Sequence, residues 1–140
     1  MTIRTILVPL DGSKNSFKGL EEAIYIAQLC SAKITVLHII SSLPPIPITD
    51  KIWKYRELMK RQSNEIFNKA RQIAKRHGMD FEEKVIFGFP QYDVAYFANK
   101  KKYDLVVIGA RGLSSIKELF LGSVSNATVH KSKVPVLVVK

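Results

Sequence analysis

Short apolar runs alternate with amphipathic stretches along the whole chain. The apolar runs are rich in Val, Ile and Leu, which is typical of buried strands. Between them, apolar residues recur every three or four positions, as they do on the buried face of a helix. We predict strands over Ile3–Leu10, Lys33–Ile40, Phe81–Phe87, Tyr103–Ile108 and Val134–Val139. We predict helices over about 13–30 and 50–78, from 90 onward, and over 123–131.

Local signals indicate where the predicted helices begin and end. Ser13 follows the turn residues Asp11 and Gly12, and a serine side chain can cap the free amides of a helix start. Gly78 indicates the end of the second helix, and Pro90 suits the first turn of the third. The strand before Pro90 has the pattern of a half-exposed edge strand, with the alternating residues Phe81, Glu83, Val85 and Phe87.

Five strands separated by helices predict an α/β fold, a single doubly wound domain over residues 1–140 with helices on both faces of a parallel sheet. The first and fourth strands both end in turn-rich loops, at Asp11–Ser13 and Gly109–Gly112. We therefore expect these two strands to be neighbours. Right-handed crossovers then favour the strand order 3-2-1-4-5.

The composition is that of one globular domain with a basic surface. The net charge is +10, from 22 Lys and Arg against 12 Asp and Glu, which favours anionic partners such as a nucleotide, nucleic acid or anionic lipid. Much of the positive charge lies in 51–76 and 100–102, where solvated surface is the favoured interpretation because no aromatic residues interleave with the lysine triplet. Cys30 has no second cysteine with which to pair, and neither a leader nor a bilayer-length apolar stretch is evident. We therefore expect a cytoplasmic protein.

The end of the fourth strand has the features of a phosphate-binding site. Gly109 and Gly112 allow the backbone to turn and to approach a ligand closely. Gly122 and Ser123 then begin a helix, and the free amides at a helix start attract anions. Ligands of open parallel sheets bind beyond the carboxyl ends of the strands, so we expect Asp11 to face these residues across a crevice.

The same residues carry a resemblance. Gly109-x-x-Gly112 followed after nine residues by Gly122-Ser123, with a Val-Pro-Leu-Asp-Gly-Ser segment over 8–13 and Pro-Val-Leu-Val-Val over 135–139, is similar to the universal stress protein family over the whole chain. In that family the complete motif marks the ATP-binding branch, whose members usually form homodimers. The resemblance implies that the adenosine contacts Pro9, Asp11, Ile39 and Ile108, and that the phosphates contact Gly109, Gly112, Gly122, Ser123, Val124 and Ser125.

Several of these residues have an alternative interpretation. Asp11 could bond amides at the start of the first helix instead of a ribose hydroxyl or a metal. By spacing alone, Ile39 is a core residue. Arg111 lies between the glycines and could pair with a phosphate, although it matches no fixed family residue and could equally be a surface arginine.

Catalytic signatures are weak. The three histidines, His38, His77 and His130, are scattered without metal-ligand spacing, and a triad of Ser13 or Ser123 with His130 and Asp11 lacks a nucleophile elbow. No P-loop motif is present and no general base lies near the phosphate motif. We therefore predict no catalytic residues and slow or absent ATP hydrolysis, with Mg²⁺ or Mn²⁺ held mainly by the phosphates near Asp11.

The partners follow from the last strand and from the charge. Val134–Val139 forms an apolar edge strand, and antiparallel pairing of two copies about a two-fold axis predicts a homodimer. A rival interpretation is an RNA-binding module, because Gly109-Ala-Arg-Gly112 resembles the Gly-x-x-Gly loop of KH domains, although that loop joins two helices. A module that keeps the fold without a nucleotide is a third possibility.

Overall fold

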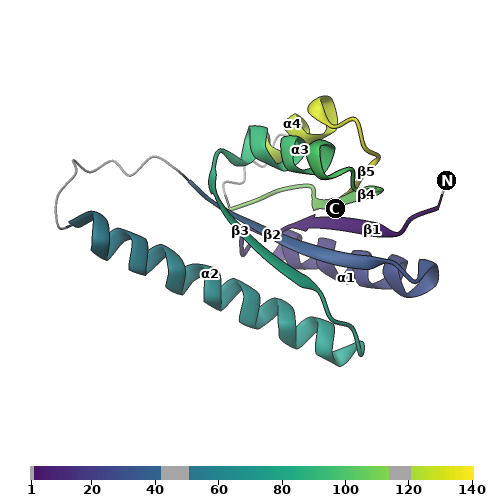
Figure 1. Ribbon diagram of the computed structural model, residues 1–140, viewed down its shortest axis with the longest axis horizontal. Coiled ribbons are helices and arrows are strands. Elements are labelled where there is room, and N and C mark those ends of the chain that lie inside the picture. The colour runs from purple at the N-terminus through teal and green to yellow at the C-terminus, as the bar shows by residue number, and fades with distance from the viewer. Residues whose placement is uncertain (1, 42–50, 114–120) are drawn as a thin grey trace.

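The computed structural model of the chain describes residues 2–41, 51–113 and 121–140. These residues form a five-stranded parallel sheet in the order β3-β2-β1-β4-β5, with helices on both faces (Figure 1). The predicted fold class and strand order are therefore confirmed. The strands are β1 (Thr5–Pro9), β2 (Lys33–Ser41), β3 (Glu82–Gly88), β4 (Leu105–Gly109) and β5 (Val136–Val139), and the helices are α1 (Lys14–Cys30), α2 (Lys51–Arg76), α3 (Pro90–Lys101) and α4 (Ser123–Lys131).

The two faces of the sheet each bury an apolar cluster, because successive residues of a strand point to opposite sides. On one face, Ile6 and Val8 of β1 pack with α1 and α2. On the other, Leu7 of β1 packs with α3 and with Ile108 of β4. Since β1 is central and covered on both faces, its run Ile6–Val8 is fully buried.

The helix boundaries have local causes that the sequence anticipated. The Ser13 hydroxyl accepts a hydrogen bond from the amide of Ser16, and α3 begins at Pro90. Gly78, just beyond the end of α2, has a φ of 65°, a left-handed conformation that glycine adopts without strain. The expected start of α2 near position 50 lies outside the described residues, which resume within the helix at Lys51.

A side chain joins β1 and β4 at their amino ends. One carboxylate oxygen of Asp104 accepts hydrogen bonds from the amides of Arg4 and Thr5, both at 2.9 Å, and from the Thr5 hydroxyl at 3.0 Å. These donors lower the pKa of the Asp104 carboxyl. The contact holds the two central strands together, so their carboxyl ends emerge side by side.

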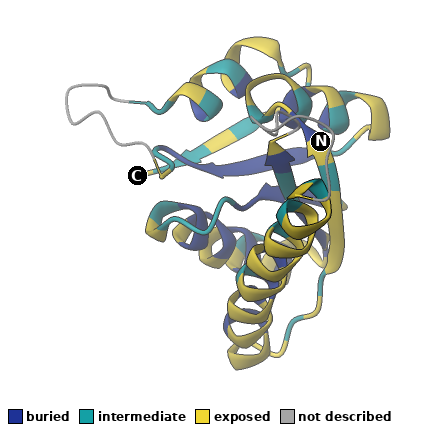
Figure 2. Ribbon diagram, turned by 90° about the vertical axis from the view of Figure 1, so that its left-hand side faces the viewer, coloured by how far each residue is buried: buried dark blue, intermediate teal, exposed yellow. Residues whose placement is uncertain are grey.

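The edge strand β3 departs from the expected burial pattern. Its position at the edge is as predicted, but Val85 and Phe87 are 45% and 56% exposed, whereas Ile86 between them is partly buried against the other face. The reason is the placement of α2, whose buried residues begin only at Ser63. The first half of this helix extends past the sheet and is mostly exposed (Figures 1 and 2).

Within the described ranges 2–41, 51–113 and 121–140, no helix combines the length and the apolar character needed to cross a bilayer.

Candidate functional site

A cavity of about 240 Å³ opens beyond the carboxyl ends of β1 and β4. This is the point at which the winding of the sheet reverses, where open α/β sheets bind ligands. All eleven residues that the sequence singled out line this cavity, namely Pro9, Asp11, Ile39, Ile108, Gly109, Arg111, Gly112, Gly122, Ser123, Val124 and Ser125. The structure thus brings together the ends of β1, β2 and β4 and the start of α4, and these residues are up to 116 positions apart in the sequence.

The carboxylate of Asp11 bridges two loops. One oxygen accepts the amide of Ser13 at 2.8 Å, next to the start of α1. The other accepts the amide of Leu113 at 3.2 Å, in the glycine loop after β4. The amide-bonding role that the sequence left open is therefore observed, and it extends to a second loop. Because a carboxylate can accept about four hydrogen bonds, Asp11 retains acceptor capacity toward the cavity.

Glycine is required at 109, 112 and 122 because other atoms lie close to its Cα, and not because the backbone there is left-handed. Among the described glycines only Gly12 and Gly78 have positive φ. A Cβ on Gly112 would lie 2.5 Å from Oδ2 of Asp11, and one on Gly122 would lie 3.3 Å from the carbonyl oxygen of Ala110. The sharp turns expected at Gly109 and Gly112 are thus made in ordinary backbone conformations.

Gly109 has a different neighbour. A Cβ there would lie 2.6 Å from the backbone oxygen of Asn15, in the first turn of α1. The missing side chain therefore allows α1 to pack closely on β4, and this glycine serves the scaffold as well as the cavity lining.

The start of α4 lines the cavity with Ser123, Val124 and Ser125. The first bond within the helix runs from the amide of Asn126 to the carbonyl of Gly122, and no described residue accepts the amides of Ser123, Val124 and Ser125. Together with the helix dipole, they form a site that favours negative charge.

Two groups expected to face a phosphate are instead engaged with the backbone. The amide of Gly122 donates to the carbonyl of Ala110 at 2.6 Å. The hydroxyl of Ser125, a residue only 2% exposed, donates to the same carbonyl at 2.7 Å. These bonds join the glycine loop to α4, because the buried carbonyl of Ala110 needs a donor. Both groups thus have an acceptor within the protein, and their contact with a phosphate stays a prediction.

The rest of the cavity wall is apolar. Ile39 of β2 and Ile108 of β4 belong to the cluster under α3, and Ile39 is only partly buried, so it contributes to the cavity wall as well as to the core. Sequence reasoning missed Leu10, Ser16, Leu37, Pro90, Val94 and Leu113. The predicted strand order could have indicated Leu37, because β2 adjoins β1, whereas Pro90 and Val94 depend on how α3 packs over the sheet.

His38 lies on the opposite face of β2 from the cavity and connects the sheet to α2. Its Nδ1 is 2.8 Å from the hydroxyl of Ser63, and its ring meets Phe67 edge to face. Burial lowers the pKa of His38, and the negative charge of Asp11 partly opposes this effect. A structural histidine, as the sequence indicated, agrees with these contacts.

Among the described residues that line the cavity, Asp11 is the one side chain of a type that commonly binds metal ions. His130 lies in the last turn of α4, about 10 Å along the helix from Ser123, so the two cannot form a triad. Within residues 2–41, 51–113 and 121–140, no three His, Cys, Asp or Glu side chains lie together as metal ligands would. The Gly-x-x-Gly loop follows β4, so it does not join two helices as in a KH domain.

The model of the universal stress protein family matches residues 2–140. The chain belongs to this family. Among curated relatives, it is 33% identical to universal stress protein YxiE of Bacillus subtilis, covering 96% of this chain and 97% of that protein. It is 30% identical to a universal stress protein of Methanocaldococcus jannaschii, covering 98% of this chain and 82% of that protein.

Solved structures of other universal stress proteins share the fold. The UspA protein of Lactobacillus plantarum superposes with a TM-score of 0.86 at 23% identity, covering 100% of this chain and 99% of that one. A universal stress protein in complex with cAMP gives 0.73 at 29% identity, covering 100% and 98%. One from Archaeoglobus fulgidus in complex with dAMP gives 0.72 at 23% identity, covering all of both chains.

Proposed function

We propose that this universal stress protein binds ATP beyond the carboxyl ends of β1 and β4, and that it acts in the cytoplasm as a nucleotide-dependent sensor or regulator of a stress response. The observation that carries the proposal is that the start of α4, the closely packed glycine backbone and an apolar slot all line one cavity. Two structural neighbours in complex with cAMP and dAMP support an adenine nucleotide as the ligand.

Each part of the nucleotide has a chemically suitable surface. The adenine enters the apolar slot beside Ile39 and Val94, where burial of its ring faces supplies affinity. The ribose meets the free acceptor capacity of Asp11. The cavity volume lies just below the roughly 300–1,000 Å³ of typical small-molecule sites, so the polyphosphate lies at its mouth, over the start of α4.

The phosphates find positive potential at the mouth of the cavity. The amides of Ser123–Ser125 and the dipole of α4 favour their charge, and Arg111 lines the same wall. Among the described residues of the lining, Asp11 is the one acidic side chain, and one carboxylate cannot form a cation cage. Mg²⁺ or Mn²⁺ is therefore held mainly by the phosphates, near Asp11. When bound, the metal supplies charge neutralisation.

ATP hydrolysis is slow or absent in this proposal. Phosphoryl transfer to water needs a group that orients or deprotonates the nucleophile. The described residues that line the cavity include no His, Glu or Lys, and both carboxylate oxygens of Asp11 already accept backbone amides. Binding without hydrolysis suits a sensor, because the fraction of protein with bound ATP then depends on the ATP concentration alone.

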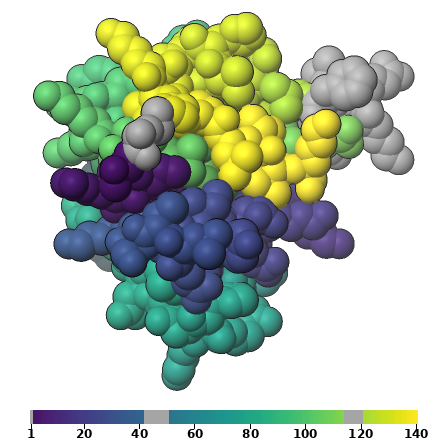
Figure 3. All heavy atoms as spheres, turned by 90° about the vertical axis from the view of Figure 1, so that its right-hand side faces the viewer, coloured from purple at the N-terminus to yellow at the C-terminus, as the bar shows by residue number. Residues whose placement is uncertain are grey.

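The second part of the proposal is a homodimer through residues 134–139. The strand β5 lies at the edge of the sheet beside β4, and its Leu137 is 38% exposed. The C-terminal residues, in yellow in Figure 3, lie at the molecular surface. Antiparallel pairing of two such strands would satisfy the open backbone groups of both.

Native mass spectrometry of the purified protein tests the proposal directly. We expect the mass of a dimer with one adenine nucleotide per chain, released as ATP on denaturing extraction. A protein that carries no nucleotide and does not bind added Mg-ATP would contradict the proposal. Affinity for single-stranded RNA that falls steeply with salt, without retention of ATP, would instead favour the RNA-binding interpretation.

A further inference from the structure

The edge strand β3 offers an open side for strand pairing. It pairs with β2 on one side, and no described residue pairs with it on the other. An edge strand has a row of free amide and carbonyl groups, which can pair with another extended chain. Seven residues long, with the exposed side chains of Val85 and Phe87, this edge is suited to such pairing.

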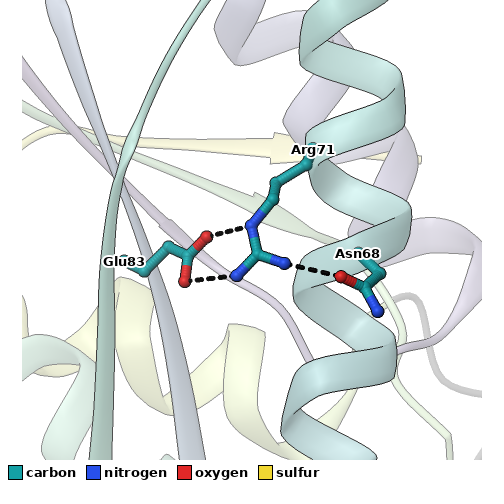
Figure 4. A network of polar contacts seen from close by, with 3 residues as sticks. All are labelled: Asn68, Arg71 and Glu83. Atoms are coloured by element: carbon teal, nitrogen blue, oxygen red, sulfur yellow. Dashed lines mark hydrogen bonds and ion pairs between the residues drawn. The ribbon is translucent and has the colours of Figure 1, made fainter.

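An ion pair shows which side of α2 faces this edge. Arg71 donates to both carboxylate oxygens of Glu83 on β3, and to Asn68 in the preceding turn of its own helix (Figure 4). Trp53 lies eighteen residues before Arg71, or five turns at about 3.6 residues each, so both point to the same side of the helix. Lys60 lies about three turns before Arg71 and shares that side.

The first half of α2 extends beyond the level of the exposed side chains of β3 (Figure 1). The helix runs antiparallel to the strand (Figure 1). The ion pair places Arg71 level with Glu83, and Phe87 lies four residues further along β3. With rises of about 3.3 Å per strand residue and 1.5 Å per helix residue, Phe87 is therefore level with a position roughly nine residues before Arg71. Lys60 lies just beyond this level, whereas Trp53, which is 68% exposed, lies roughly 14 Å beyond it along the helix.

Charge decides which partner suits this surface. Residues 51–62 carry five basic side chains and one acidic one, the latter being Glu57. None of these twelve residues is buried. If two copies paired through this surface about a two-fold axis, residues 51–62 of one copy would face those of the other and be repelled, whereas an acidic segment is attracted.

We propose that β3 binds an extended acidic segment of a partner protein as an additional strand. Main-chain hydrogen bonds to the open side of β3 supply affinity, and alternate apolar side chains of the segment pack on Val85 and Phe87. The remaining carboxylates of the segment lie in the positive field of the first half of α2. We call this surface, formed by Val85, Phe87 and residues 51–62, the β3 edge surface.

The probe is a fluorescein-labelled synthetic peptide of about nine residues, a usual strand length, with alternating Val and Glu. Two matched peptides replace each Glu by Lys, or the central Val by Pro, which cannot donate a main-chain hydrogen bond. We expect saturable binding of the acidic peptide to the full chain that weakens as salt is raised. The Lys and Pro peptides should bind at least about tenfold more weakly. A loss of this size corresponds roughly to the contribution of one strong hydrogen bond or of one important interface contact.

Variants of the protein locate the site. Phe87→Lys and the charge reversal Lys60→Glu should each weaken binding of the acidic peptide by roughly tenfold. Leu29→Lys on α1 and Lys100→Glu on α3 are the matched controls, since both residues are exposed and distant in sequence from the β3 edge surface, and they should leave binding unchanged. Circular dichroism and thermal melting check that each variant is folded.

Three outcomes overturn the proposal. The first is that the acidic peptide does not bind at millimolar concentration. The second is equal binding of the Pro or Lys peptide, or binding that Phe87→Lys leaves unchanged. The third is self-association in sedimentation experiments that Phe87→Lys abolishes, which would assign the surface to a second copy of the chain.

Discussion

The carboxylate of Asp11 accepts the backbone amide of Leu113 at 3.2 Å, although the two residues are 102 positions apart. With its second bond to the amide of Ser13, it connects the loop after β1 to the glycine loop after β4. The two loops that border the proposed phosphate site are thus held at a defined separation before a ligand arrives. Such preorganisation lowers the entropic cost of binding.

Asp11→Ala should therefore weaken both the fold and the site. We expect a loss of about 1–3 kcal/mol in the free energy of unfolding, as for hydrogen bonds to a charged group, and a roughly tenfold or greater loss of ATP affinity. Asp11→Asn keeps one acceptor and should be intermediate. Urea denaturation and calorimetric titration with Mg-ATP measure the two effects. Full ATP affinity in Asp11→Ala would contradict the bridging role.

Substitutions of Gly109 and Gly122 should have different effects. Gly109→Ala places a Cβ 2.6 Å from the Asn15 carbonyl, so we expect destabilisation of about 1–3 kcal/mol, as in overpacked sites. Gly122→Val should abolish nucleotide retention and leave the circular-dichroism spectrum intact, because it crowds the loop at the start of α4, where the backbone conformation suits any residue.

Gly78→Asn serves as the control for both. Gly78 has positive φ, which Asn tolerates, and a Cβ there would meet no atom within 4 Å. Its spectrum and nucleotide content should match those of the unmodified protein, and its melting temperature should fall only slightly. Nucleotide retention by Gly122→Val would mean that the phosphate assignment is incorrect.

The lowered pKa of His38 predicts that the stability of the fold depends on pH. Burial lowers its pKa in the folded state below the ordinary value of 6.5, so the unfolded chain binds the proton first as the pH falls. The stabilising contribution is present above pH 6.5 and is lost as the pH falls through the lowered pKa of the folded state. Urea denaturation between about pH 8 and pH 5 should show this loss in the unmodified protein and not in His38→Asn. The same pH profile in both proteins would exclude His38 as its source.

The proposed homodimer predicts a monomeric variant. Leu137→Lys places a charge at an exposed position of β5, where the partner strand would approach. We expect a monomer by light scattering at concentrations where the unmodified protein is a dimer. Leu29→Lys on α1, whose leucine is more exposed, should remain a dimer. A dimer that persists in Leu137→Lys would assign the contact to another surface.

Local chemistry explains which elements could be predicted from the sequence. The predicted bounds of α4 agree with the structure, and the Ser13 cap and the Pro90 helix start depend on neighbouring residues alone. The last strand begins later than expected because Pro135 has no amide, although its carbonyl accepts the amide of Val106. The strand order followed from the two turn-rich loops and the handedness of crossovers.

Other features depend on contacts between distant segments. Periodicity indicated that Val85 and Phe87 share a face, but their exposure depends on where α2 meets the sheet. Spacing placed Ser125 at the site, but the use of its hydroxyl on the Ala110 carbonyl depends on the approach of the glycine loop to α4. The sequence by itself determined the elements and their order, because these follow from local propensity and from the geometry of parallel sheets, and the family resemblance indicated eleven of the residues around the cavity. Only the tertiary structure decided which of those residues bond to one another, since hydrogen bonds form at separations of about 3 Å that no sequence pattern resolves.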